Sequence, residues 1–227
     1  MKIDDRVVMV TGSSFGIGSE TAKLFSEKGS NVVVTYNRGE EEGKETLKRC
    51  KKNSEAILTQ LDVTDKSSIR ESRKKVLERF ETVDILINNA GILTSGELVD
   101  LSHREIEDQI DVNLTGLINT TKIFLESMLK NDEGIIINIS SGLGKSGSAR
   151  YSVYSATKFG VRGFTQSLAK ELPSGFRTYV VNPGMTATRM TDYSGTDPEK
   201  VAEVLVRTAE EDFGKRSGAD VNVRDYI

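Results

Sequence analysis

Tyr154 and Lys158 are four positions apart in the segment YSVYSATKFG, residues 151–160. In an α-helix, residues at positions i and i+4 share a face, so the phenol and the ammonium would project into the same space. An isolated phenol has a pKa of about 10, and a neighbouring ammonium favours its ionised form. The pair could therefore act as a general acid or base closer to neutral pH.

The same spacing also arises where a tyrosine packs and a lysine is solvated, so the pair needs support from other residues. Ser140 and Ser141 follow an apolar run, and Ser141 lies thirteen residues before Tyr154. A hydroxyl at this place could hydrogen-bond a reacting oxygen, or the two serines could simply end a strand.

A glycine-rich turn is predicted at residues 11–18, TGSSFGIG, between an apolar run and a helical pattern. Gly12, Gly16 and Gly18 would let the backbone approach a bound pyrophosphate, and the free amides at the helix start would favour the anion. The spacing is GxxxGxG, which differs from the usual dinucleotide fingerprint GxGxxG. Taken alone, the segment could equally be a tight turn.

Two further polar segments follow apolar runs. Asp62, in LDVTD, could accept a hydrogen bond from an adenine amino group, or it could serve as a turn or capping carboxylate. Asn88, Asn89 and Gly91, in NNAG, are turn formers. They also stand at a strand terminus, and ligands bind at the carboxyl ends of the strands in an open parallel sheet.

Strand-length apolar runs alternate with helical patterns along the whole chain. Their β-branched, nearly continuous apolar character is typical of parallel strands buried on both faces. The runs are residues 7–11, 31–36, 55–61, 84–88, 135–140 and 178–182. Between them, one helix is closed by Gly29, another covers 65–80, and a third begins with the capping-box pair Ser102 and Glu105.

This alternation predicts one doubly wound, Rossmann-like α/β domain over residues 1–227, with about six to seven parallel strands and helices on both faces. Residues 188–200 mix Gly, Asp, Ser, Thr and Pro198, which predicts a loop or a mobile lid.

Composition excludes several classes of function. The 31 Lys and Arg residues nearly balance 34 Asp and Glu, so the formal charge of -3 gives no electrostatic case for nucleic acid or an anionic membrane. Cys50 is the only cysteine, which excludes an intrachain disulfide and gives a metal site no support. With no signal-peptide pattern and no apolar stretch of about 18 residues, we expect a cytoplasmic protein.

The motifs together resemble those of the short-chain dehydrogenase/reductase family. They are, in order, TGSSFGIG at 11–18, NNAG at 88–91, Asn113 in DVNLTG, Ser141 in INISSG, and YSATK at 154–158. The resemblance extends from about residue 5 to NPGMTAT at 182–188, which is most of the chain. Within that family, the chain is similar to the 3-oxoacyl-acyl-carrier-protein reductases.

The resemblance implies a role for each member of the set. Tyr154 would protonate a carbonyl oxygen or deprotonate an alcohol, Ser141 would hydrogen-bond that oxygen, and hydride would pass between nicotinamide C4 and the carbonyl carbon. Lys158 would also bind the nicotinamide ribose, and Asn113 would hold a water that links Lys158 to solvent. The residues implied in cofactor binding are Gly12, Ser14, Phe15, Gly16, Ile17, Gly18, Asn37, Arg38, Asp62, Val63, Asn89, Ala90, Gly91, Tyr154, Lys158, Pro183, Gly184, Thr186 and Thr188.

The choice between the two nicotinamide cofactors depends on the end of the second strand, TYNRGEEEG, where a carboxylate would bind a ribose diol and repel a 2'-phosphate. The expected acidic position is Tyr36, and Arg38 nearby could pair with the phosphate. Against this, Phe15 stands where many NADP-using relatives carry a basic residue. The sequence favours NADP(H) and leaves NAD(H) open as a second cofactor.

We therefore predict an NADP-preferring oxidoreductase that reduces a 3-oxoacyl group or a small ketone. A sugar or polyol dehydrogenase is an alternative, and a dinucleotide-sensing regulatory protein without turnover is an alternative of another class. The C-terminal end departs from the family, although SGADVNV could be a shortened final strand. We expect a homodimer, formed through the helices at 114–130 and 153–171, or a homotetramer.

Overall fold

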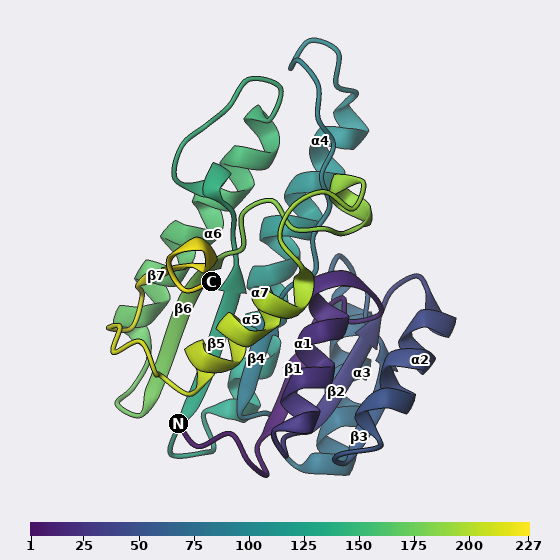
Figure 1. Cartoon of the computed structure of the whole chain (residues 1–227), viewed down its shortest axis with the longest axis vertical. Helices are drawn as coiled ribbons and strands as arrows, with labels where there is room; N and C mark the ends of the chain where they lie inside the picture. Colours follow the sequence, from purple (N-terminus) through teal and green to yellow (C-terminus); the bar gives the residue numbers. More distant parts are fainter.

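One seven-stranded parallel sheet forms the centre of the protein, in the order β3-β2-β1-β4-β5-β6-β7 (Figure 1). The computed structural model describes all 227 residues. The strands are β1 (Val7–Val10), β2 (Asn31–Tyr36), β3 (Ala56–Gln60), β4 (Ile85–Asn88), β5 (Gly134–Ile139), β6 (Phe176–Asn182) and β7 (Asp220–Asn222). The chain order reverses between β1 and β4, which is the point where open α/β sheets bind their ligands. The predicted doubly wound α/β fold is confirmed.

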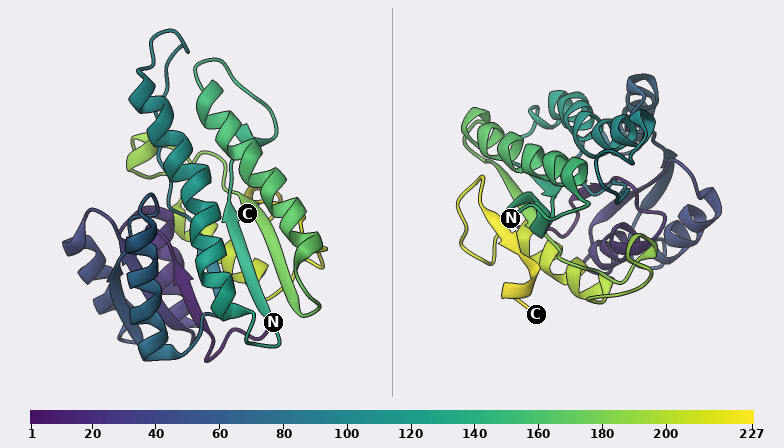
Figure 2. Two further views of the ribbon diagram at one scale, coloured as in Figure 1. Left: turned by 180° about the vertical axis from the view of Figure 1, so that it is seen from behind. Right: turned by 90° about the horizontal axis from the view of Figure 1, so that it is seen from above.

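Helices cover both faces of the sheet. They are α1 (Gly16–Glu27), α2 (Glu40–Cys50), α3 (Lys66–Phe80), α4 (His103–Ile110), α5 (Leu117–Met128), α6 (Ser152–Glu171) and α7 (Pro198–Ala209). In Figure 1, α1, α2 and α7 lie in front of the sheet, and Figure 2 shows α3, α5 and α6 on the opposite face. None of these helices is long and apolar enough to span a lipid bilayer.

Two hydrophobic cores separate these helices from the sheet. Val8 and Val10 of β1 pack into the core beneath α1, α2 and α7. Val7 and Met9 of the same strand pack into the core beneath α3, α5 and α6. Since successive side chains of a strand point to opposite faces, both faces must be apolar, and this explains the nearly continuous apolar runs.

Helix starts follow the predicted capping chemistry. Asp65 precedes α3, and its side chain accepts a hydrogen bond from the Ser67 amide. Ser102 and Glu105 form a reciprocal capping box at the start of α4. These local bonds satisfy amides that the helices leave free.

Two expectations need correction. The segment 188–200 contains the 3-10 turn Arg189–Thr191 and is a loop only as far as Asp197, because Pro198 is the first residue of α7 and its fixed φ suits that position. The helix expected to start near 114 begins instead with a π-helical turn, Asp111–Gly116, ahead of α5. By contrast, the shortened final strand is confirmed, since β7 pairs in parallel with β6.

Candidate active site

Tyr154 and Lys158 lie together on the first turns of α6, near the carboxyl end of β5. The Lys158 Nζ atom is 5.6 Å from the centroid of the Tyr154 ring. It also donates a hydrogen bond of 3.0 Å to the carbonyl oxygen of Ile139, the last residue of β5. Both side chains are buried, so the shared helical face predicted from their spacing is present in the fold.

Burial controls the ionisation of both groups. It lowers the pKa of Lys158 from 10.5 to about 8, because the ammonium loses its hydration. Burial raises the pKa of the Tyr154 phenol, and a hydrogen bond with Ser141 only opposes this in part. Burial therefore holds the Tyr154 pKa above its ordinary value here, and the lowering of that pKa by Lys158 and a bound nicotinamide stays a prediction. A protonated phenol is suited to donate a proton rather than to accept one.

The two serines after β5 have different surroundings. The buried Ser140 hydroxyl donates a 3.0 Å hydrogen bond to the Lys158 carbonyl oxygen and so fastens β5 to α6. Ser141 begins the 3-10 turn Gly142–Gly144, and its Oγ accepts from the Leu143 amide at 3.2 Å. Only Ser141 acts on the Tyr154 phenol, and it remains partly exposed.

Asn113 occupies the π-helical turn before α5 and is buried. Its amide pairs twice with the Ile92 main chain, because Nδ2 donates to the Ile92 oxygen and Oδ1 accepts from the Ile92 amide, both at 2.8 Å. A Cβ at Gly91 would lie 3.2 Å from Asn113 Oδ1 and 3.7 Å from Lys158 Nζ. Asn113 thus holds the chain after β4 against the Lys158 amine, while its link to a water stays a prediction.

The glycine turn between β1 and α1 has no room for larger residues. Gly12 and Gly16 have φ values of 65° and 60°, which favour glycine. A Cβ at Gly18 would lie 2.4 Å from the Gly12 carbonyl oxygen. Phe15 precedes α1 with extended backbone and no side-chain cap, so the first amides of the helix have no side-chain partner. These residues fit the pyrophosphate of a dinucleotide.

The NNAG segment supports this turn from β4. Asn89 Nδ2 donates to the main-chain oxygens of Thr11 and Gly12 at 2.9 and 3.1 Å. The Thr11 hydroxyl accepts from the amides of Asn89 and Ala90, both at 2.9 Å. Thr11 was not singled out in the sequence analysis. The position of Thr11 directly before Gly12 was the feature of the sequence that could have indicated its role.

Asn37, Arg38 and Asp62 meet where β2 and β3 end. Burial alone would raise the pKa of Asp62, but hydrogen bonds from Thr64 and Asn37 and the charge of Arg38 hold it below its ordinary value. Asp62 Oδ1 accepts hydrogen bonds from the Thr64 amide and hydroxyl, so Asp62 also acts as the turn carboxylate that the sequence allowed. Arg38 makes no salt bridge, and β2 ends in Tyr36 rather than a carboxylate, with Glu40 of α2 beside the Tyr36 hydroxyl.

The other predicted cofactor residues divide into two groups. Ile17 and Val63 pack in the cores, and the Ser14 carbonyl accepts from the Thr46 hydroxyl at 3.3 Å. The segment after β6 that contains Pro183, Gly184, Thr186 and Thr188 returns towards the glycine turn. A Cβ at Gly16 would lie 3.2 Å from Thr188 Cγ2. The structure therefore brings Thr188 to the glycine turn and leaves Ile17 and Val63 mainly as packing residues.

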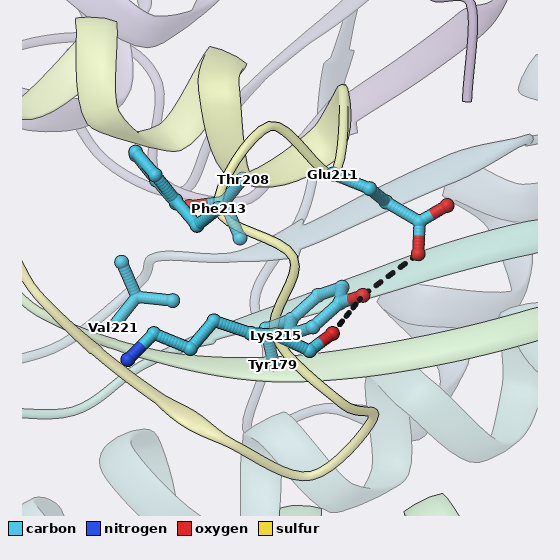
Figure 3. Close-up of a pocket in the computed structure, with 6 residues that line it drawn as sticks. All are labelled: Tyr179, Thr208, Glu211, Phe213, Lys215 and Val221. Carbon is cyan, nitrogen blue, oxygen red and sulfur yellow. Dashed lines mark hydrogen bonds between the residues drawn. The ribbon is translucent and has the colours of Figure 1, made fainter.

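Two cavities have no lining residue from the predicted catalytic set. The one in Figure 3, where the Tyr179 hydroxyl donates to Glu211 at 2.8 Å, has about 10 Å³, no more than one water requires. An open cavity of about 380 Å³ lies between α4 and α6 and contains no member of the catalytic set. Its lining residues are Leu98, Ile106, Ile110, Leu114, Ser152, Val153, Ala156 and Thr157.

No group of three or more His, Cys, Asp or Glu side chains is arranged to hold a metal ion. The predicted chemistry at Tyr154 and Lys158 requires none.

Comparison with known proteins gives consistent matches over most of the chain. The family model described as short chain dehydrogenase matches residues 6–199. A 3-oxoacyl-[acyl-carrier-protein] reductase of Thermotoga maritima is 35% identical over 222 residues, 95% of this chain and 87% of that protein. An uncharacterized oxidoreductase of Staphylococcus saprophyticus is 36% identical over 215 residues, 91% of this chain and 92% of that protein. A crystal structure of a short chain dehydrogenase from Burkholderia cenocepacia in complex with NADP superposes with a TM-score of 0.89 and 28% identity, covering 98% of this chain and 97% of that one.

Proposed function

Because the chain belongs to the short-chain dehydrogenase family and is an NAD(P)-dependent oxidoreductase, we propose that it reduces the carbonyl group of a 3-oxoacyl compound or a small ketone. The observation that carries this proposal is the cluster of the partly exposed Ser141 with the buried Tyr154 and Lys158 at the carboxyl end of β5. A regulatory protein without turnover would have no use for such a cluster.

Each residue of the cluster has a distinct task. The Ser141 hydroxyl orients the substrate oxygen by a hydrogen bond, and the neutral Tyr154 phenol donates its proton to that oxygen. The Lys158 ammonium stabilises the phenolate that remains. Asn113 keeps the loop after β4 beside Lys158. The nicotinamide, when bound, supplies the hydride for reduction and accepts it for oxidation.

NADP(H) is the proposed cofactor, with NAD(H) as a second one. Support comes from the end of β2, where Arg38 is free of a salt bridge and Tyr36 takes the place of a carboxylate. A 2'-phosphate there would meet the Arg38 cation, while Asp62 is engaged by Thr64 and the nearby Glu42 by Arg189. The related crystal structure described above holds NADP, which agrees with this assignment.

A homodimer is proposed through α6, one of the two helices expected at the interface, with α4 in place of the helix expected at 114–130. Leu98, Ile110 and Phe159 are exposed hydrophobic residues, and Phe159 is 43% exposed. Leu98 and Ile110 line the apolar cavity between these helices. A patch of this kind on a folded protein is typical of an interface. The cytoplasmic location stays a prediction.

The Tyr154→Phe variant tests the mechanism, with Tyr151→Phe as a matched control three residues away. Because a positioned acid contributes about 10²–10⁴-fold, turnover of a responsive ketone with NADPH should fall at least about a hundredfold in Tyr154→Phe. Cofactor binding, followed by fluorescence titration, should change little. A panel of ketones and 3-oxoacyl thioesters with NADPH, against sugars and polyols with NADP, identifies the substrate. Near wild-type turnover in Tyr154→Phe would refute the mechanism.

A further inference from the structure

Arg189 connects the chain after β6 to the starts of α1 and α2. It lies in the 3-10 turn Arg189–Thr191, within a segment, residues 186–196, that we call the strap. Its guanidinium carbon is 4.6 Å from the centroid of the Phe15 ring. Its NH2 group is 3.1 Å from Glu42 Oε1. One side chain therefore links the strap to the start of α1 and to the first turn of α2.

These contacts place the guanidinium between the start of α1 and the first turn of α2, which follows β2. Phe15 is the residue before α1, whose free amides suit a pyrophosphate. Glu42 lies in the first turn of α2, and its Oε2 atom would be 2.9 Å from a Cβ at Gly39, three residues after the end of β2. The end of β2 is where a fold of this kind distinguishes a ribose diol from a 2'-phosphate. Arg189 is therefore within the region where the phosphate would lie.

The strap is held together by backbone hydrogen bonds. The Thr196 amide donates to the Met185 oxygen at 2.9 Å, and the Ala187 amide donates to the Thr196 oxygen at 2.8 Å. Gly195, with φ of 114°, closes this ring where a Cβ would lie 2.3 Å from the Met185 oxygen. The backbone that carries Arg189 is thus held in place by its own hydrogen bonds.

The ion pair between Arg189 and Glu42 can be exchanged for another partner. The Arg189 and Glu42 side chains are 54% and 41% exposed, and an ion pair so open to water adds little stability. A phosphate carries more charge than a carboxylate and offers more acceptor oxygens to a guanidinium. A phosphate at the end of β2 would therefore compete well with Glu42 for Arg189.

We propose that Arg189 is a specificity-determining residue that exchanges Glu42 for the 2'-phosphate of NADP(H). Arg38 approaches the same phosphate from the end of β2, and Arg189 approaches it from the strap. Glu42 holds Arg189 when no phosphate is present. This inference rests on the proposed function, because it requires a dinucleotide at the glycine turn.

Fluorescence titration of NADPH and NADH tests the assignment on wild type, Arg189→Ala and Arg49→Ala. Arg49 is a matched control, because it is also on the surface, 57% exposed, and paired with a glutamate, but it lies near the far end of α2. Loss of a hydrogen-bonded charge should raise the Kd of NADPH about tenfold or more in Arg189→Ala. The Kd of NADH should change less than about twofold, and Arg49→Ala should bind both nucleotides as wild type does.

Glu42→Gln provides an independent measurement. Removing the competing anion should lower the Kd of NADPH and leave that of NADH unchanged. Weaker NADH binding in Glu42→Gln would instead show that Glu42 accepts the ribose hydroxyls, which overturns the assignment. Equal weakening of both nucleotides in Arg189→Ala, or no weakening, overturns it as well. A wild-type protein that binds neither nucleotide would overturn the proposed function itself, whereas normal binding with an unchanged NADPH-to-NADH ratio overturns only this inference.

Discussion

Replacement of Lys158 by methionine removes a buried charge and keeps an apolar stem of similar length. The Lys158 side chain is 4% exposed, and its Nζ has the Ile139 carbonyl but no carboxylate within salt-bridge distance. Burial therefore lowers its pKa from 10.5 to about 8. Since each unit of pKa corresponds to about 1.4 kcal/mol, the folded state disfavours the ammonium by about 3 kcal/mol.

The direction of the pH effect follows from this lowered pKa. Between about pH 8 and the unfolded value of 10.5, the unfolded chain binds more protons at this site than the folded chain does. The wild-type free energy of unfolding should therefore rise through this window, relative to Lys158→Met, by about 3 kcal/mol. Below the window the difference should be constant, because the amine is then protonated in both states.

Urea unfolding of the cofactor-free proteins over this pH range measures the effect. Lys170→Met, at the exposed end of the same helix, controls for the loss of one lysine. The lost hydrogen bond to Ile139 changes the free energy of unfolding of Lys158→Met by the same amount at every pH. Only the pH dependence of the difference from wild type therefore reports the buried charge. A difference between wild type and Lys158→Met that stays flat across the window would refute the desolvation of Lys158. A difference that falls with pH would show that an unrecognised anion raises its pKa.

Three further predictions concern the turn, the cofactor and the assembly. Gly18→Ala should lower the free energy of unfolding by about 1–3 kcal/mol through overpacking and abolish nucleotide binding, whereas Gly147→Ala, with nothing near its Cβ, should have almost no effect in thermal melts. Arg38→Ala should raise the KM for NADPH about tenfold and that for NADH much less, and equal changes would contradict the 2'-phosphate assignment. Phe159→Asp should convert a dimer into a monomer in sedimentation, so a wild-type monomer would exclude the proposed interface.

Much of the fold was predictable because strands buried on both faces require apolar runs. The run at 31–36 coincides with β2, and the capping pair Ser102 and Glu105 marks the start of α4. The π-helical turn Asp111–Gly116 was not predictable. Asn113 in that turn pairs with Ile92, which is distant in the sequence, so no local pattern carries this information.

The candidate site was predictable in its residues and less so in its chemistry. Spacing alone places Tyr154 and Lys158 on one helical face, and the glycine turn has a recognisable motif. The separate surroundings of Ser140 and Ser141, by contrast, depend on how α6 packs against β5. The contact of Arg189 with Phe15 joins residues from opposite ends of the chain, and nothing in either segment indicates it.

The sequence by itself determined the alternation of strands and helices, the glycine turn, and the common face of a phenol and an amine. These features depend on backbone geometry and on the order of neighbouring residues, which the chain carries locally. Only the tertiary structure decided that burial raises the Tyr154 pKa and lowers that of Lys158. The physical reason is that desolvation depends on every atom that excludes water from a group, and those atoms come from segments far apart in the chain.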